Sequence, residues 1–239
     1  MPVKPGLSLN VRAVVFLQVG LLAGCHENEI ANRAAVAESA PAEAAPVTVK
    51  GPERLILAFG DSLYAGYNLK RGETMPGHVE VLLRQQGINA KMVNAGVSGD
   101  TTAAGRKRLT FALDNLPRKP DLVLLGLGGN DVLRQIPIAE TRANMVAMLD
   151  ELRRRDIPVV LTGMRAPPNL GPDYAGQFDA MYPALAREYQ AELDPFVLQG
   201  VLGDRHLMLP DGIHPNEKGL NVMASRIAPI VARRLKAAG

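Results

Sequence analysis

The sequence predicts an α/β fold, a three-layer α/β/α sandwich in which helices cover both faces of a central parallel sheet of about five strands. Two observations predict it. From residue 53 onward, short apolar runs alternate with longer amphipathic stretches, the pattern of strands joined by helical crossovers. The run 122–127 is apolar throughout, as a strand covered on both faces should be. A chain of 239 residues is long enough for one such domain.

The expected strands and helices follow one another in order along the chain. The first strand is the apolar run Leu55 to Phe59, which ends at Gly60. Further strands are expected at 90–94, 122–127, 157–162 and 192–196. Amphipathic stretches predict helices at 75–86, 103–116, 138–154, 174–189 and 216–236. Asn216 is the expected cap of the last helix.

Polar loops are expected to meet at one edge of this sheet. In a parallel sheet the carboxyl ends of the strands share an edge, and ligands bind there. The loops after Phe59, Asn94, Leu127 and Thr162 should therefore form one rim. Three of them contain unusual polar residues: Gly60-Asp61-Ser62-Leu63, the stretch 94–101, and Gly128-Gly129-Asn130-Asp131. A fourth polar group, Asp211-Gly212-Ile213-His214-Pro215, precedes the last helix.

These four blocks, in this order, resemble those of the SGNH hydrolases, also called GDSL esterases and lipases. The resemblance covers essentially all of residues 53–239. It is strongest for the bacterial periplasmic multifunctional esterases described as acyl-CoA thioesterase, lysophospholipase L1 and arylesterase. The segments 164–169 and 178–183 resemble that subgroup too. The resemblance implies a flavodoxin-like SGNH hydrolase fold and a carboxylic ester hydrolase.

Ser62, Asp211 and His214 are the expected catalytic residues. A serine hydroxyl is a poor nucleophile until a base removes its proton, and histidine is the usual base near neutral pH. Asp211 lies three residues before His214, a spacing that can bring its carboxylate to the imidazole and fix the tautomer. We therefore expect Ser62 as nucleophile, His214 as general base and Asp211 as the residue that orients it.

The tetrahedral intermediate of such a reaction needs hydrogen-bond donors for its oxyanion. The resemblance implies that these donors are the backbone N–H groups of Ser62 and Gly99 and the side-chain amide of Asn130. Glycine at position 99 permits a close approach and an unusual backbone geometry.

Other polar residues of the chain are expected to be structural. Asp61 should cap the turn that follows it, and Asn94 and Asp131 should tie loops together. His78 and His206 are expected at surface or loop positions. Because the sequence has no cluster of cysteine and histidine, we expect no metal and no cofactor.

Apolar residues near the third and fourth strand ends are candidates for an acyl pocket beside Ser62. Such a pocket suits an acyl chain better than a sugar, and it separates chain lengths by only about 1–3 kcal/mol per methylene, so broad specificity is expected. Some of the candidates could equally belong to the core. They are Leu133, Ile136, Pro137, Met164, Pro167 and Met208, with Val132 and Pro168 besides.

The expected substrate is a small-molecule or lipid ester, because thioesters, aryl esters and lysophospholipids share one mechanism. Two alternatives stay open. The first is a carbohydrate O-acetylesterase that removes acetyl groups from envelope polysaccharide with the same triad. The second is a non-catalytic envelope lipoprotein that uses the fold for binding, against which the intact triad and oxyanion positions argue.

The first 24 residues are expected to be a lipoprotein signal peptide. Lys4 and Arg12 precede an apolar run at 13–22 that is too short to span a bilayer as a stable helix. The run ends in Leu-Ala-Gly before Cys25, which is the only cysteine of the sequence. Its thiolate can carry a lipid, so Cys25 is the expected lipidation site. The alternative is an ordinary secretory signal with an incidental cysteine.

Residues 25–52 are rich in Ala, Glu and Pro and predict a flexible tether before a hydrolase domain at 53–239. The protein is thus expected to be lipid-anchored in a bacterial cell envelope and to face the periplasm. The outer membrane is favoured because His26, not aspartate, follows the cysteine. The net charge of +3 includes Lys4 and Arg12, so the rest is nearly neutral, which argues against nucleic acid as a partner. We expect a monomer.

Overall fold

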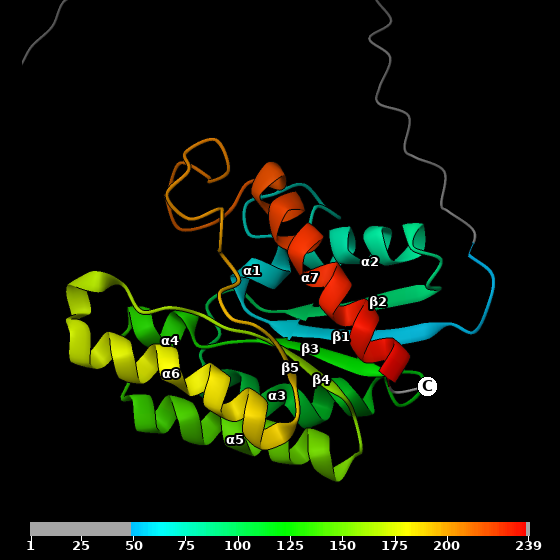
Figure 1. Ribbon diagram of the computed structural model, residues 1–239, viewed down its shortest axis with the longest axis horizontal. Helices are drawn as coiled ribbons and strands as arrows, with labels where there is room; N and C mark the ends of the chain where they lie inside the picture. Colours follow the sequence, from blue (N-terminus) through cyan, green and yellow to red (C-terminus); the bar gives the residue numbers. More distant parts are fainter. Residues whose placement is uncertain (1–48, 238–239) are drawn as a thin grey trace, which may run out of the picture. The chain divides into compact units, whose positions relative to one another are not determined.

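A computed structural model describes residues 49–237 of the chain, and its centre is one sheet of five parallel strands (Figure 1). The strand order is β2-β1-β3-β4-β5. The strands are β1 (Arg54–Gly60), β2 (Ala90–Gly96), β3 (Leu122–Gly126), β4 (Val159–Thr162) and β5 (Glu192–Asp194). All neighbouring pairs are parallel, so their carboxyl ends lie along one edge, as the sequence predicts.

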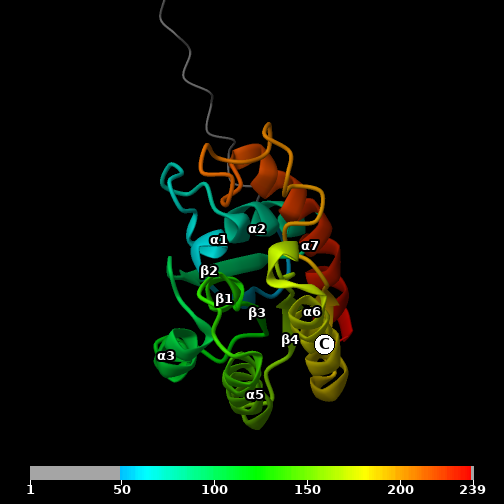
Figure 2. The same ribbon diagram turned by 90° about the vertical axis from the view of Figure 1, so that its left-hand side faces the viewer.

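Helices cover both faces of this sheet, which confirms the three-layer α/β/α prediction (Figures 1 and 2). One face is covered by α1 (Ser62–Ala65), α2 (Met75–Gln85) and α7 (Glu217–Ala237). The other face is covered by α3 (Thr102–Asp114), α5 (Ile138–Arg154) and α6 (Pro172–Tyr189). Two shorter segments lie in the rim loops: α4 (Gly129–Leu133) and a 3₁₀ helix (Pro168–Leu170).

The core forms on both sides of the sheet because alternate strand residues point to opposite faces. In β1, Ile56 and Ala58 pack with α2 and α7, whereas Leu57 and Phe59 pack with α3, α5 and α6. All four side chains are buried. A strand that is buried on both faces has no polar face, which explains the continuous apolar runs in the sequence.

Two expected strands are shorter than their apolar runs. The strand expected at 157–162 begins only after Pro158, because proline has no N–H group for the sheet. The strand expected at 192–196 ends at Asp194, directly before Pro195. Proline therefore sets both boundaries.

The long helices lie within two residues of their expected positions. Asn216 caps α7 as expected, since its Oδ1 accepts the Gly219 N–H at 3.1 Å. The periodicity does not mark α1 and α4, because helices of four and five residues are too short to show it. These two short helices hold Ser62 and Asn130.

The N-terminal predictions concern a part of the chain that the structure does not describe. The expected signal peptide, the lipidation at Cys25 and most of the expected tether lie outside residues 49–237. Within that range, no helix combines the length and apolarity that crossing a bilayer requires.

Candidate active site

Ser62 lies at the first position of α1, directly beyond the carboxyl end of β1. Asp61 caps this helix as expected, because its Oδ1 accepts the Leu63 N–H at 3.0 Å. The turn requires glycine at position 60, where a Cβ atom would lie 2.4 Å from the Tyr64 ring and 2.9 Å from a backbone oxygen of β3. This tight turn places Ser62 at the rim of the sheet.

Ser62, His214 and Asp211 form a continuous chain of hydrogen bonds. His214 Nε2 lies 2.9 Å from Ser62 Oγ, and His214 Nδ1 lies 2.7 Å from Asp211 Oδ2. The structure therefore brings together the three residues that the sequence analysis selects, although 152 positions separate Ser62 from His214. The arrangement is that of a nucleophile, a base and an orienting carboxylate.

Asp211 also holds its own loop in shape. Its Oδ1 accepts the backbone N–H groups of Ile213 at 2.9 Å and of His214 at 3.0 Å. The backbone hydrogen bond from His214 is the main cause that lowers the pKa of Asp211 to about 2. The carboxylate therefore stays ionised in neutral solution and can stabilise a positive charge on the imidazole.

Tyr67 packs against His214, a contact that the sequence analysis missed. The two ring centroids lie 4.3 Å apart at an interplanar angle of 32°. Tyr67 follows Gly66, whose φ of +76° ends α1 and whose Cβ position would lie 2.6 Å from the Glu73 carbonyl oxygen. Spacing alone gives no signal for this contact, because it depends on the left-handed turn after α1.

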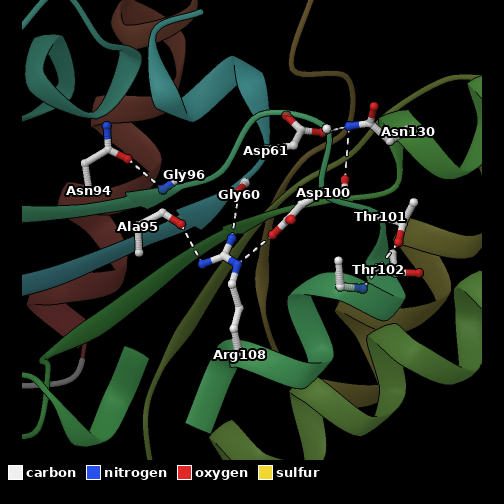
Figure 3. A network of polar contacts seen from close by, with 12 residues as sticks. Gly60, Asp61, Asn94, Ala95, Gly96, Asp100, Thr101, Thr102, Arg108 and Asn130 are labelled. Atoms are coloured by element: carbon white, nitrogen blue, oxygen red, sulfur yellow. Dashed lines mark hydrogen bonds and ion pairs between the residues drawn. The ribbon is translucent and has the colours of Figure 1, made fainter. Parts of the chain in front are cut away.

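Gly99 and Asn130, two of the three expected oxyanion residues, lie on the loops after β2 and β3, the strands that flank β1 in the sheet. Gly99 has a φ of +85°, and its carbonyl accepts a hydrogen bond from Arg134 at 2.9 Å. The Asn130 side-chain amide donates to the Asp100 carbonyl at 3.0 Å and lies 3.4 Å from Asp61 Oδ2 (Figure 3). Asn130 thereby connects the loop that contains Gly99 to the β1–α1 turn.

Asp61 is a buried carboxyl group next to Ser62 in the sequence. Its exposed fraction is 4%. Burial raises the pKa of Asp61 to about 6, and the hydrogen bond from Leu63 and the nearby His214 only partly oppose this shift. Because its contacts are a cap and one long hydrogen bond to Asn130, the geometry supports a structural role.

Asp131 joins three helices beneath the rim, as its expected structural role requires. Its side chain is fully buried and accepts hydrogen bonds from the Thr102 backbone at 2.8 Å, from the Thr102 hydroxyl, and from Thr141 at 3.3 Å. Asn144 adds a hydrogen bond to the Thr102 hydroxyl at 3.3 Å. The start of α3 is thus fixed to α4 and α5.

Arg108 of α3 connects the ends of two strands to the Gly99 loop (Figure 3). Its guanidinium donates to the Gly60 carbonyl at 2.9 Å, the Ala95 carbonyl at 2.8 Å and the Asp100 carboxylate at 2.6 Å. It also lies 3.9 Å from the ring centroid of Phe59. Arg108 has no signal in the sequence, because two of its three acceptors are backbone carbonyls that no side-chain pattern reveals.

Asn94 fixes the end of β2 to α1, also as expected. Its Nδ2 donates to the Tyr64 carbonyl at 2.8 Å, and its Oδ1 accepts the Gly96 N–H at 2.9 Å (Figure 3). A Cβ atom at Gly96 would lie 2.5 Å from the Ala65 nitrogen, so only glycine allows β2 to approach α1 this closely.

A mainly apolar pocket of about 250 Å³ opens beside Ser62 and His214. Three of the six expected lining residues, Leu133, Met164 and Pro167, lie in its wall, as does Val132. The complete lining is Asp61, Ser62, Leu63, Gly129, Asn130, Val132, Leu133, Met164, Arg165, Pro167, Phe196, Leu198, Leu202, Gly212, Ile213 and His214.

Ile136, Pro137 and Met208 do not line this pocket, unlike the other three expected lining residues. Pro137 is the exposed N-cap residue of α5. The backbone carbonyl of Ile136 instead faces the Tyr174 hydroxyl, on α6. Met208 is buried in the core with α7 and pairs with Pro215 in an isolated bridge.

The pocket wall that the sequence analysis missed comes mainly from the segment after β5. Phe196, Leu198 and Leu202 belong to it, and Ile213 belongs to the loop before α7. This segment follows the fifth strand, whereas the sequence prediction of the rim rests on the loops after the first four. Extending it to the strand expected at 192–196 would point to this wall.

The two other histidines within residues 49–237 lie apart from the pocket lining. His206 is exposed in a loop, and its N–H donates to Asp204 at 2.9 Å. His78 is half-buried on α2 rather than at the surface, and its Nε2 is buried without a hydrogen-bond partner in the described structure. Across residues 49–237, no group of three histidine, cysteine or acidic side chains could hold a metal ion.

Comparisons with known proteins place the chain among esterases. The family model of the GDSL-like lipase/acylhydrolase family matches residues 58–221. An arylesterase of Vibrio mimicus is 35% identical over 75% of this chain and 89% of its own length. The thioesterase 1/protease 1/lysophospholipase L1 of Escherichia coli K12 is 34% identical over 74% of this chain and 84% of its own length.

A solved structure agrees with these sequence relatives. The crystal structure of AlinE4, an SGNH-hydrolase family esterase, matches with a TM-score of 0.67 at 51% sequence identity. The match covers 77% of this chain and 97% of AlinE4. Fold and sequence therefore agree: the chain belongs to the GDSL-like lipase/acylhydrolase family, the SGNH hydrolases, and is a carboxylic ester hydrolase.

Proposed function

We propose that this esterase hydrolyses carboxylic esters and thioesters with broad acyl specificity through an acyl-enzyme on Ser62. The observation that carries the proposal is the hydrogen-bond chain from Ser62 through His214 to Asp211, at 2.9 and 2.7 Å. Ser62 and His214 lie in the wall of a mainly apolar pocket.

The reaction begins with proton transfer from Ser62 to His214. As Oγ bonds to the carbonyl carbon, Nε2 accepts the hydroxyl proton, and the Asp211 carboxylate stabilises the imidazolium. The imidazolium then returns the proton to the leaving oxygen or sulfur, the bond to the leaving group breaks, and acyl-Ser62 remains. His214 next deprotonates a water molecule, whose oxygen attacks the acyl carbon. The bond from the acyl carbon to Ser62 Oγ then breaks, the imidazolium returns its proton to Oγ, and the carboxylic acid leaves.

The oxyanion receives hydrogen bonds from the Ser62 and Gly99 backbone N–H groups and from the Asn130 amide. In the structure, one Asn130 N–H donates to the Asp100 carbonyl at 3.0 Å. The amide also lies 3.4 Å from Asp61, a long and weak hydrogen bond. The amide hydrogen that faces Asp61 is therefore the one that can donate to the oxyanion. The hydrogen bond to the Asp100 carbonyl keeps the amide in place meanwhile.

The pocket lining supports an acyl chain as the group that it binds. Leu63, Val132, Leu198 and other apolar side chains form most of the wall. A volume of about 250 Å³ exceeds what an acetyl group needs, which favours acyl-chain substrates over sugar acetates. The relatives named arylesterase and thioesterase 1/protease 1/lysophospholipase L1 support aryl, thiol and lysophospholipid leaving groups.

Labelling with a fluorophosphonate probe tests the nucleophile. Such a probe should form an adduct with the wild-type protein and none with Ser62→Ala, and that variant should lose on the order of a millionfold in kcat. A series of p-nitrophenyl esters from acetate to palmitate then tests the acyl pocket. A sharp preference for acetate would contradict the acyl-chain proposal and favour the carbohydrate acetylesterase.

We also propose that the enzyme is exported and anchored to the bacterial cell envelope by a lipid on Cys25. The Leu-Ala-Gly-Cys pattern after a short apolar run supports this location in the cell envelope. Cys25→Ser should move the protein from the membrane fraction to the soluble fraction. If both forms fractionate with the membrane, the lipid is not the anchor.

A further inference from the structure

The catalytic pocket contains a cation that ester hydrolysis at Ser62 does not use. Arg165 lies in the loop after β4 and lines the pocket together with Ser62 and His214. Its side chain is exposed, and its guanidinium carbon lies 5.3 Å from the ring centroid of Phe196, which also lines the pocket. Within residues 49–237, no carboxylate forms an ion pair with Arg165.

Other arginines show what a structural role for this side chain looks like in the same protein. Arg226 binds the Asp194 carboxylate at 2.9 Å and also donates to the Val197 carbonyl. Arg108 likewise combines a carboxylate with backbone carbonyls. Arg165 has a ring on one side and solvent on the other, so its N–H donors remain available for an anion.

The burial of the lining residues indicates where a bound anion would lie. Val132 and Leu198 are 3% and 6% exposed and form the deep part of the wall, whereas Leu133 is 57% exposed at its edge. Arg165 is exposed as well. An amphiphilic ester would place its hydrocarbon along the buried wall and keep its hydrated end near the guanidinium.

We propose that Arg165 forms an anion-binding subsite of the catalytic pocket and that the enzyme prefers esters carrying a carboxylate, phosphate or sulfonate over neutral esters of equal size. The inference rests on the proposed hydrolysis at Ser62 and names the substrate class of that site. A planar guanidinium can donate two parallel N–H groups to two oxygens of such an anion. The anion can belong to the acyl chain or to the leaving group, because both share this chemistry.

Matched pairs of esters test the subsite and distinguish its two sources. The acyl pair is the p-nitrophenyl monoester of suberic acid against p-nitrophenyl octanoate. The leaving-group pair is the butyrate ester of 4-hydroxybenzenesulfonate against that of 4-(methylsulfonyl)phenol. The quantity measured is the ratio of kcat/KM for the anionic ester to kcat/KM for the neutral ester, in wild type, Arg165→Met, Arg165→Lys and Arg187→Met.

Arg165→Met keeps the apolar stem against Phe196 and removes the charge. It should lower the ratio about five- to tenfold in at least one pair, through KM, as expected for a partly exposed charge-assisted hydrogen bond. Arg165→Lys should keep part of the preference for the anionic ester, because it keeps the positive charge. Added salt should reduce the preference of the wild-type enzyme. Arg187→Met is the control, because Arg187 is an exposed arginine of α6 outside the pocket lining.

Each contrary result has its own meaning. Equal losses for anionic and neutral esters in Arg165→Met would overturn the subsite and leave Arg165 as packing for Phe196. The same change of ratio in Arg187→Met would also overturn it, since net charge alone would then explain the preference. If wild type hydrolyses none of the four esters, the proposed function fails, and with it the substrate class that rests on it.

Discussion

The two sides of the catalytic site are held in different ways. The loop of Asp211 and His214 depends on its own hydrogen bonds, from Asp211 to two backbone N–H groups and to the imidazole, and its residues are largely exposed. The side that contains Gly99 and Asn130 depends on buried or half-buried side chains from other elements. Arg108 connects it to β1 and β2, and Asp131 connects α4 to α3 and α5.

This difference follows from what each side must do. Oxyanion donors are effective only when they are in position before charge develops, so a network anchored in the core suits them. In the proposed reaction, the imidazole must instead exchange a proton with Ser62 and with a leaving group, and a local turn suffices to orient it. Changes on the base side should therefore affect chemistry alone, and changes beneath the oxyanion side should also affect folding.

Asp211→Asn should have the largest effect on catalysis and little effect on stability. Losing the carboxylate removes the control of the imidazole tautomer, and comparable triads then lose about 10⁴-fold in kcat. The asparagine oxygen can still accept the N–H groups of Ile213 and His214, so the turn should survive. Rapid kinetics with a p-nitrophenyl ester measures the loss of kcat, and thermal melting measures the stability. A large fall in Tm would mean that the base loop is not held locally.

Asn130→Ala should lower kcat by about 10²- to 10³-fold, the usual cost of one oxyanion donor. KM should change little, because the donor acts mainly on the charge that develops in the transition state. Steady-state kinetics on the same ester separate the two parameters. A rise in KM with kcat unchanged would assign Asn130 to substrate binding instead.

Arg108→Met should destabilise the protein by about 3 kcal/mol, because it removes the guanidinium that pairs with the Asp100 carboxylate and donates to the Gly60 and Ala95 carbonyls. Urea unfolding measures this free energy. Lys107→Met is the matched control: Lys107 is the exposed neighbour on α3, and its loss should cost no more than about 0.5 kcal/mol. Equal effects of the two variants would show that the network beneath the oxyanion side does not stabilise the fold.

Asp61→Asn should change how stability depends on pH. Burial raises the pKa of Asp61 from 3.8 to about 6, so between these values the folded protein holds a proton that the unfolded chain has lost. The contribution of Asp61 to wild-type stability therefore falls as pH rises through this window, by about 2–3 kcal/mol in total, and is not recovered above pH 6. Asparagine does not ionise, so Tm of the variant minus Tm of wild type should increase from pH 4 to pH 7.5. A constant difference would show that Asp61 titrates alike in both states.

The sequence predicts the base side of the site better than the oxyanion side, for a physical reason. Asp211 and His214 lie three residues apart, and the order of strands brings their loop to Ser62, so local spacing and topology suffice. Arg108 reaches the Gly60 carbonyl across 48 positions. A carbonyl acceptor leaves no trace in the side-chain pattern, so such a contact becomes visible only when the fold is known.

The fold itself follows closely from the sequence, because apolar runs buried on both faces have few alternatives. The pocket follows less well. Ile136 and Pro137 are expected in the pocket because they follow the loop after the third strand, but α5 begins at Ile138 and neither residue is in the pocket lining. Phe196 and Leu202 reach the pocket through an irregular segment after β5, whose path depends on packing rather than on periodicity.

Tyr67→Ala should have the smallest of these effects and tests whether the base side is held by its own loop alone. Tyr67 comes from the segment after α1, and its ring packs against His214 at a centroid distance of 4.3 Å. The ring keeps the imidazole in place and favours the positive charge that it gains during acylation, a contact worth about 0.5–1 kcal/mol at an exposed site. The variant should therefore lose about two- to fivefold in kcat/KM, and Tyr67→Phe should keep nearly full activity because the ring face remains. If both variants lose activity equally, the Tyr67 hydroxyl rather than the ring would be the group that acts. If neither does, Asp211 suffices to hold the base.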